Sequence, residues 1–488
     1  MLSPARSLLA LSLAALASGC AIAPRNDCPQ LKGPAWQELR SEHFQLRTDL
    51  DPKDAQAALV RFEQFRSALL NAWGAGYRPP GVVDVVVFAK PSELEAIYGR
   101  DEHGQVIWGS GSHTGTGLRM VLSGKGGSIL GGTGYKDVAP MYLMAWELTR
   151  QAMPSAPTWV REGFATYLET ANIDDTETKT ILGKPYRNKL YYLAQHSRLT
   201  LEQLWDYEKY PDEQAEASAW LWTHYLLAAH GDRFADFQAR LTRGEPARPA
   251  FQKAFAGVDW DREQLEIHAY LREQHFRVYQ YALATPAVTP QVRVLEDGEV
   301  HALKAELWEG GRRSEAQKKA EVAEQLRQAQ AHDPAGVGTR LMLAQRLTGA
   351  DERLVAARQL AHDFPQSLAA WKFLDAELPH GDATREERGE ALTRALALAP
   401  SDPEVLNAYA WHFAWGETAQ RAYEAARQAR LMMPYSANTL DTYALAAAAV
   451  GRCNEALSVQ RVAVSLVDSA GPEMLKRLRR YEGGCKEH

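Results

Sequence analysis

Cysteine is scarce in this sequence, with only four residues in 488: Cys20, Cys28, Cys453 and Cys485. None stands at C-x-x-C spacing, which argues against a zinc ribbon and a dithiol redox site. Runs of basic residues are also lacking, and 55 Lys and Arg against 61 Asp and Glu give a net charge of −6. This charge balance argues against the basic surface that nucleic-acid binding requires, so no nucleic-acid partner is expected.

Long apolar runs are absent beyond the N-terminus. There, residues Leu8 to Ala17 form an unbroken run of apolar and weakly polar side chains. This run is too short to span the ~30 Å hydrocarbon core of a membrane. Arg6 precedes it, and Ala17-Ser18-Gly19 separates it from Cys20. A basic start, a short apolar stretch and small residues before a cleavage point predict an export signal at 1–19.

The ending of this signal in small residues and Cys20 resembles the bacterial lipobox. The resemblance implies cleavage before Cys20 and its acylation by fatty acids such as palmitate, and Ala21 implies the outer rather than the inner membrane. Burying acyl methylenes at ~0.8 kcal/mol each then anchors the chain in the cell envelope, facing the periplasm. Because that compartment is oxidising, a Cys453–Cys485 disulfide is expected.

The remaining composition is that of a globular protein, with 45% hydrophobic and 24% charged residues, and the length allows two or three domains. Residues 20–34 contain three prolines and predict a lipidated tether. Residues 35–284 predict an α+β domain with a small sheet followed by helices. Its patterned segments are expected strands at 43–47, 82–88 and 118–122 and an expected helix at 55–73.

Residues 285–303 have no helical period in their first half and predict a linker to an all-α region at 304–488. Four prolines close helix-like stretches of that region and recur every 31 to 35 residues: Pro334, Pro365, Pro400 and Pro434. Side chains also repeat, as Leu406 with Leu440 and Ala429 with Ala463. Small residues at this period let paired helices approach closely.

This period resembles the tetratricopeptide repeat, most clearly over 403–468. The resemblance implies an array of helical hairpins that binds a protein or peptide on its concave, first-helix face. Five side chains are expected there: Glu404, Asn407, Trp411, Asn438 and Asp441. Alternatively, Trp411 belongs to the core of the repeats.

A second resemblance rests on Trp146-Glu147-Leu148-Thr149-Arg150 and on the segment from Trp159 to Glu169, which contains Glu162-Gly163. Both segments resemble the gluzincin, peptidase-MA-like metallopeptidases, which read H-E-L-T-H followed by a glutamate ligand on the next helix. By this resemblance, Glu147 matches the general base and Glu162 the third zinc ligand. The two histidines of the family are replaced by Trp146 and Arg150.

These replacements remove the metal chemistry that the family uses. Indole nitrogen only donates hydrogen bonds and a guanidinium keeps its proton, so neither Trp146 nor Arg150 can ligate zinc. Catalytic zinc needs three protein ligands, and Glu162 supplies one. No metal, cofactor or catalytic residue is therefore expected in the degenerate site, although a replacement metal site using His113 is an alternative. We expect Arg150 to form an ion pair with Glu162 and to stack on Trp146. Alternatively, Trp146 and Arg150 face solvent and contact neither partner.

Together these patterns predict an outer-membrane-anchored pseudopeptidase and scaffold that binds protein or peptide partners through its repeats. Its former active-site cleft is a further place for a peptide, which the strand at 118–122 could bind as an exposed sheet edge. Two alternatives remain open: an active metallopeptidase with an unorthodox metal site, and a spacer that presents the repeats.

Overall fold

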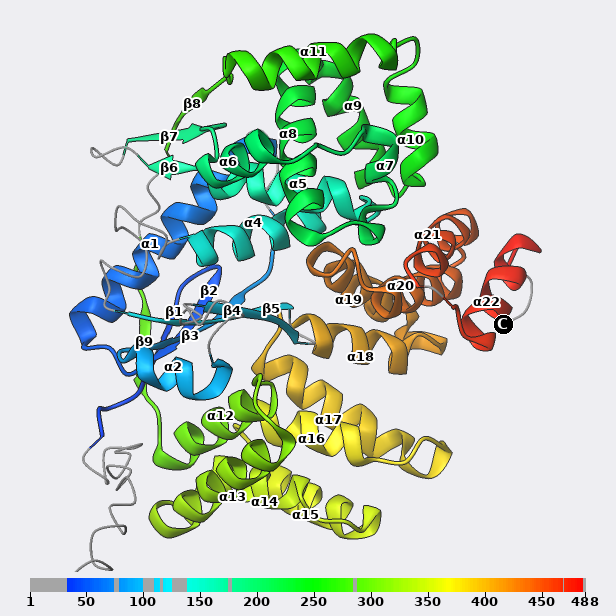
Figure 1. Ribbon diagram of the computed structural model, residues 1–488. Coiled ribbons are helices and arrows are strands. Elements are labelled where there is room, and N and C mark those ends of the chain that lie inside the picture. Colours follow the sequence, from blue (N-terminus) through cyan, green and yellow to red (C-terminus); the bar gives the residue numbers. More distant parts are fainter. Residues whose placement is uncertain are drawn as a thin grey trace, which may run out of the picture.

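The computed structural model describes residues 33–73, 79–99, 109–114, 117–124, 138–173, 178–283, 288–467 and 469–485, with only the backbone described at 109–114, 117 and 138–140. The expected signal peptide and nearly all of the tether, with Cys20 and Cys28, lie outside these residues. Figure 1 shows an α+β part, drawn from blue to green, and a helical array drawn from green to red.

A six-stranded sheet lies in the N-terminal part, in the order β4-β5-β3-β2-β1-β9. Its strands are β1 (Gln37–Arg40), β2 (Phe44–Thr48), β3 (Val83–Phe88), β4 (Gly109–Thr114), β5 (Gly117–Ser123) and β9 (Gln291–Val294). Strands β2, β3 and β5 are parallel, and the other three pair antiparallel with their neighbours. The strands expected at 43–47, 82–88 and 118–122 are confirmed as β2, β3 and β5.

The expectation that the strand at 118–122 forms an exposed edge is wrong. This strand, β5, lies between β3 and β4, with Val121 opposite both Val86 and Ser110. The glycine-rich stretch before β5 forms β4, which folds back along it as an antiparallel partner. The edge of the sheet is therefore β4.

Helices cover both faces of the sheet, because successive residues of a strand point to opposite sides. Val85 and Val87 of β3 pack in one core with α1 (Pro52–Leu70) and α4 (Val138–Ala152). Val86 and Phe88 pack in a second core with α2 (Pro91–Tyr98) and α12 (Asp297–Glu309). Helix α1 and the short 3-10 helix η2 (Asn71–Trp73) confirm the helix expected at 55–73.

A helical subdomain with a small three-stranded sheet follows α4. Its elements are α5 (Thr158–Glu169), β6 (Asn172–Ile173), β7 (Lys179–Leu182), α6 (Arg187–Gln195), α7 (Leu201–Leu204), η3 (Tyr207–Lys209), α8 (Asp212–Ala229), α9 (Gly231–Thr242), α10 (Ala247–Ala254), α11 (Trp260–Glu273) and β8 (Tyr279–Ala282). Gly163 lets α5 approach α8 closely, since a Cβ there would collide with the carbonyl oxygen of Ala219. This contact explains the glycine that follows Glu162.

The segment expected as a linker at 285–303 is in part integral to the N-terminal fold. It contains β9, which pairs with β1, and the first half of α12. Polar contacts hold α12 beneath the sheet: the Lys304 ammonium lies 3.2 Å from the Glu93 carboxylate, and Arg119 lies 2.7 Å from Glu306. The all-α region thus starts on the sheet itself, and no free hinge separates the two parts at residues 288–303.

The all-α region consists of consecutive helices that pack as pairs. They are α13 (Glu315–His332), α14 (Val337–Gln345), α15 (Ala350–Asp363), α16 (Leu368–Glu377), η4 (Asp382–Thr384), α17 (Arg385–Leu398), α18 (Pro403–Phe413), η5 (Gly416–Thr418), α19 (Ala419–Met432), α20 (Ala437–Ala449), α21 (Cys453–Ser465) and α22 (Pro472–Glu482). Each of the four periodic prolines follows the end of α13, α15, α17 or α19 by two residues, as expected of a residue that cannot continue a helix.

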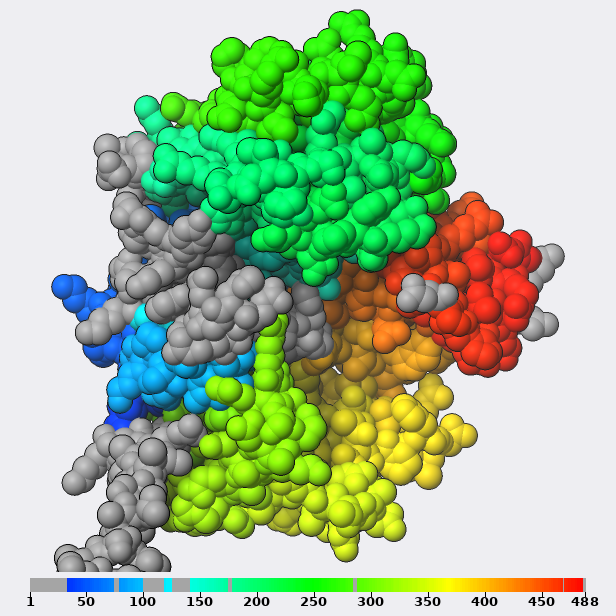
Figure 2. Space-filling model, viewed as in Figure 1, coloured from blue at the N-terminus to red at the C-terminus, as the bar shows by residue number. Residues whose placement is uncertain are grey.

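The array returns to the N-terminal part at its far end. Figure 2 shows the last repeats, in orange and red, against the green helical subdomain. A Cβ added at Gly244, in the turn after α9, would lie 2.7 Å from Cγ2 of Val462 in α21. The array is therefore attached at both ends. In the part of the chain that the structure describes, no helix is long and apolar enough to cross a membrane.

Candidate functional site

The segments compared with the peptidase motif lie where α4 packs against α5. Helix α4 carries Trp146, Glu147 and Arg150, and the first half of α5 carries Glu162. Glu147 is 2% exposed, so its carboxylate requires hydrogen-bond donors inside the protein. Neighbouring side chains supply these donors, as the contacts below show.

Glu162 is held by an indole and a phenol. Nε1 of Trp146 donates to its Oε1 at 2.9 Å, and the hydroxyl of Tyr142 donates to its Oε2. Burial, together with the charge of Glu162, raises the pKa of Tyr142, which keeps the phenol protonated as a donor. Trp146, at the expected first histidine position, therefore stabilises the Glu162 carboxylate.

The expected ion pair between Arg150 and Glu162 is wrong. Arg150 instead pairs with Glu147, one turn earlier on its own helix, with Nη2 2.9 Å from Oε2. Glu162 already accepts hydrogen bonds from Trp146 and Tyr142, so its charge is stabilised without the guanidinium. The expected stacking of Arg150 on Trp146 is confirmed, at 5.2 Å from the ring centroid.

A tyrosine from the repeats completes this site. Tyr435 lies in the turn between α19 and α20, and its hydroxyl donates to Oε1 of Glu147 at 2.9 Å. Nε2 of Gln151 donates to the same oxygen at 3.0 Å. The guanidinium of Arg150 lies over the Tyr435 ring, 3.4 Å from its centroid. Glu147 thus binds three neighbours and is not free to activate a water molecule.

The contacts of Tyr435 fill the cleft beside Glu147 and Arg150. The cavity beside Tyr435, which Glu147, Met144 and Met432 help to line, measures about 30 Å³. That volume holds about one or two water molecules and no peptide. Among the described residues this cavity is too small for a peptide, and peptide binding in the cleft stays a prediction.

The residues present do not fit a catalytic zinc ion. Within the described residues, no group of three or more His, Cys, Asp or Glu side chains is placed to hold a metal. His113 lies in β4, where only the backbone is described. The alternative of a replacement metal site that uses His113 therefore stays a prediction. The carboxylates of Glu147 and Glu162 instead accept hydrogen bonds from N–H and O–H groups.

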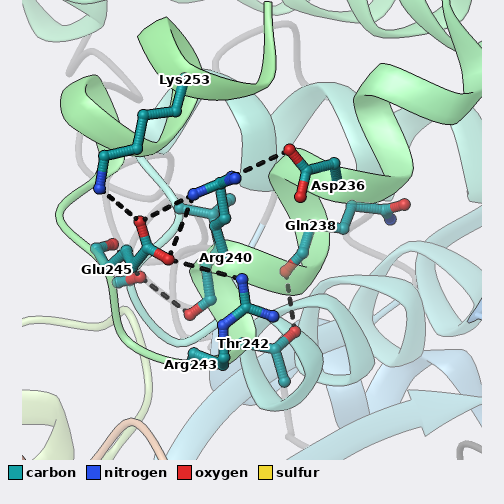
Figure 3. Close-up of polar contacts among 9 residues, drawn as sticks. Asp236, Gln238, Arg240, Thr242, Arg243, Glu245 and Lys253 are labelled. Atoms are coloured by element: carbon teal, nitrogen blue, oxygen red, sulfur yellow. Dashed lines mark hydrogen bonds and ion pairs between the residues drawn. The ribbon is translucent and has the colours of Figure 1, made fainter.

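A second contact holds the last repeats, at the turn between α9 and α10. Glu245 accepts hydrogen bonds from Arg240, Arg243 and Lys253, which fix this turn (Figure 3). The hydroxyl of Thr242 donates to the carbonyl oxygen of Ala152 at the end of α4, 2.6 Å away. The braced turn presents Gly244 to α21.

A much larger groove lies within the array, between α16, α17, α18 and α20. It measures about 540 Å³. Its lining residues are Asp375, His380, Gly381, Asp382, Arg385, Arg388, Leu392, Asn407, Ala408, Trp411, His412, Trp415, Asn438, Asp441 and Thr442. Four of the five partner-binding residues expected from the sequence lie among them.

The side chains of the groove combine exposed aromatic rings with polar groups. Trp411 and Trp415 are each 42% exposed, so Trp411 is not a core residue of the repeats. The buried Oδ1 of Asn407 has no hydrogen-bond partner. Burial, followed by the charges of Arg385 and Arg388, lowers the pKa of His412, so this ring is a neutral hydrogen-bonding group near pH 7.

Two of the expected residues are engaged within the protein. The carboxylate of Glu404 pairs with Lys372 and does not line the groove. Asp441 lines the groove but is 5% exposed, and it accepts hydrogen bonds from Arg477 of α22 and from Gln460. These two carboxylates therefore fix helices in place.

The sequence interpretation did not include Trp415, Arg385 or Tyr435. Trp415 stands four residues after Trp411, a helical spacing that could have identified it. Arg385 follows the irregular Pro379-His380-Gly381 segment, which hides its place in the groove. Tyr435 has no local signal, because its partner Glu147 is 288 positions away in the chain.

The thiols of Cys453 and Cys485 lie within hydrogen-bonding reach of each other, and both are free in this structure. Burial and the neighbouring Cys453 thiol raise the pKa of Cys485 to about 12. The disulfide expected between them stays a prediction for oxidising conditions.

No protein-family model and no curated protein matches the chain. It is similar to TTC0263, a thermophilic TPR protein of Thermus thermophilus, with 15% identity, a TM-score of 0.26, and 38% of this chain and 98% of that chain covered. It is also similar to yeast Tom70, with 12% identity, a TM-score of 0.29, and coverages of 72% and 75%. TM-scores this low carry no argument about function, and the helical repeat array is established here by the chain's own paired helices.

Proposed function

We propose that this protein is a non-hydrolytic scaffold of the bacterial cell envelope that binds an extended segment of a partner protein in the groove of its repeats. The observation that carries the proposal is the groove itself. At about 540 Å³ it lies in the size range of ligand sites, and it combines two exposed tryptophans with amide side chains.

Each type of side chain suits an extended peptide. The amides of Asn407 and Asn438 both donate and accept, so they can pair with the N–H and C=O groups that an extended backbone leaves free. Trp411 and Trp415 offer flat apolar surfaces with little conformational entropy to lose on binding. Aromatic residues of this kind dominate the binding energy of protein interfaces.

The degenerate cleft supports a scaffold rather than an enzyme. The carboxylate matched to the general base is held by Arg150, Gln151 and Tyr435, and the position of the second histidine carries a guanidinium. A water molecule bound to zinc has no place in this arrangement. We therefore propose a pseudopeptidase domain that serves as the support of the array.

Anchoring at the outer membrane through an acylated Cys20 is part of the proposal, and it rests on the lipobox-like sequence alone. A lipid anchor at the N-terminus would place the groove in the periplasm within reach of envelope proteins.

Photo-crosslinking in living cells tests the groove. A benzophenone amino acid is placed at Trp415 in the groove or, as the matched control, at Leu431, which is 56% exposed on α19 and does not line the groove. We expect one discrete crosslinked partner from position 415, lost when Asn438→Ala is added, and none from position 431. The same products from both positions would contradict the proposal.

A further inference from the structure

The contacts of Tyr435 resemble those of a bound ligand more than those of a core side chain. The ring comes from the turn between α19 and α20, is presented by the repeats, and enters a pocket formed by another part of the chain. Its hydroxyl meets the Glu147 carboxylate at 2.9 Å, and one face of the ring meets the Arg150 guanidinium at 3.4 Å. Both polar features of a phenol are therefore recognised.

The chemistry of this pocket selects a tyrosine among aromatic side chains. A carboxylate accepts a hydrogen bond from a hydroxyl more strongly than a neutral group does, and a guanidinium binds the face of an electron-rich ring. Burial, followed by the negative charge of Glu147, raises the pKa of Tyr435, so its hydroxyl remains a donor. Phenylalanine would lack that donor, and a cationic side chain would lie against Arg150.

The pocket is built on rigid elements. Glu147, Arg150 and Gln151 lie on consecutive turns of α4, whose other face packs in the main core of the domain. Gln151 orients the same carboxylate oxygen that receives the tyrosine hydroxyl. Met144 and Leu148 of α4 line the cavity beside the ring.

We propose that the degenerate cleft is a tyrosine-binding site, filled here by the chain's own Tyr435, and that its ligand class is the para-substituted phenol. Binding of Tyr435 fastens the last repeats to the N-terminal part. A segment that presents a tyrosine on a turn competes for the same site. This inference goes beyond the proposed function and does not depend on what the groove binds.

Chemical rescue tests the site in the full-length chain. Tyr435→Ala leaves a vacancy between Glu147 and Arg150, and 4-methylphenol is titrated against toluene, which has the same ring without the hydroxyl. We expect 4-methylphenol to raise the melting temperature of this variant and to bind it about tenfold more tightly than toluene. Tyr481→Ala is the control, because its buried vacancy lies in the core of the repeats, away from Glu147 and Arg150. There the two compounds should bind alike.

A peptide of residues 432–438 provides the second arm. It should bind the Tyr435→Ala variant, bind about tenfold more weakly when its tyrosine is replaced by phenylalanine, and not bind the wild-type protein, whose site is filled. Equal binding of 4-methylphenol and toluene, or of the two peptides, would overturn the inference.

A double-mutant cycle covers the case in which Tyr435→Ala does not fold. Tyr435→Phe and Glu147→Gln are introduced singly and together, and their unfolding is compared. We expect non-additive effects, because the two changes remove one shared hydrogen bond. Strictly additive effects would also overturn the proposal.

Discussion

The two residues at the expected histidine positions, Trp146 and Arg150, each contact a carboxylate. Trp146 donates to Glu162, and Arg150 pairs with Glu147. A buried carboxylate without a donor or a positive charge would destabilise the fold. These two contacts therefore explain how the fold accommodates both glutamates.

The Arg150–Glu147 pair should matter for stability. Replacing Arg150 by Met leaves the Glu147 carboxylate, whose side chain is 3% exposed, without its positive neighbour. We expect a loss of about 3 kcal/mol in the free energy of unfolding, measured by denaturant titration. Arg427→Met is the control, because Arg427 and Glu424 form a pair with the same spacing in solvent, and a loss below about 1 kcal/mol is expected there. Equal losses would contradict the account.

Glu169, on the last turn of α5, should make stability depend on pH. Burial is the largest effect on this carboxyl and raises its pKa to about 7, although Tyr186 donates to it at 2.8 Å. Between the unfolded value near 4.5 and about 7, the folded state binds the extra proton, so stability falls as pH rises through this window.

Glu169→Gln should remove this dependence. At pH 8 the variant should be more stable than the wild type by about 3 kcal/mol, and the difference should largely disappear at pH 5. Thermal or urea unfolding at the two pH values measures it. A constant difference between the proteins would show that the carboxyl titrates normally.

The sequence identified the residues of the degenerate site but not their pairing. Positions 146, 147, 150 and 162 follow from the motif, because helical spacing places them near one point. Which donor reaches which carboxylate depends on the angle between α4 and α5 and on Tyr142 and Tyr435. Those two tyrosines come from outside the motif, so spacing alone could not predict that Arg150 turns to Glu147.

At the scale of helices, the repeat period makes a third stability prediction. Ala429 of α19 and Ala463 of α21 are fully buried where helices approach closely. Leucine at either position should overpack the contact and lower the free energy of unfolding by about 1–3 kcal/mol. Gln428→Leu, one residue before Ala429 and exposed, should change it by less than about 0.5 kcal/mol. An unchanged melting temperature in both alanine variants would contradict the helix register.

Elements were predictable where a local pattern determines them. The apolar β-branched stretch of β3 and the prolines after α13, α15, α17 and α19 were sufficient. The order of strands was not, because β4 has a weak glycine-rich pattern and β9 joins the sheet from a distant segment. Strand β9 is exposed along its whole length, so nothing in its composition distinguishes it from a linker.

At the scale of the molecule, the array starts on the sheet and ends on the helical subdomain. Contacts of α12 hold the first end, and Tyr435 and Val462 hold the other. Attachment at both ends limits how far the array can bend, so the groove between α16 and α20 is held in shape. A preformed groove loses less conformational entropy when a segment binds.

The proposed anchor is tested by Cys20→Ser. The variant should remain unprocessed or be released in soluble form, because no acyl chain can be attached. Membrane fractionation with detergent partitioning measures it. Normal membrane recovery of the processed variant would rule out the lipid anchor and leave the groove unaffected.

The central claim is that the partner segment binds in the groove of the repeats. Titration of the crosslinked partner segment against two variants, Trp415→Ala and Tyr435→Ala, tests it most directly. We predict at least about tenfold weaker binding by Trp415→Ala, as for an interface aromatic, and a change within about twofold for Tyr435→Ala. Unchanged affinity in Trp415→Ala, with tighter binding once Tyr435 no longer fills the cleft, would contradict the account.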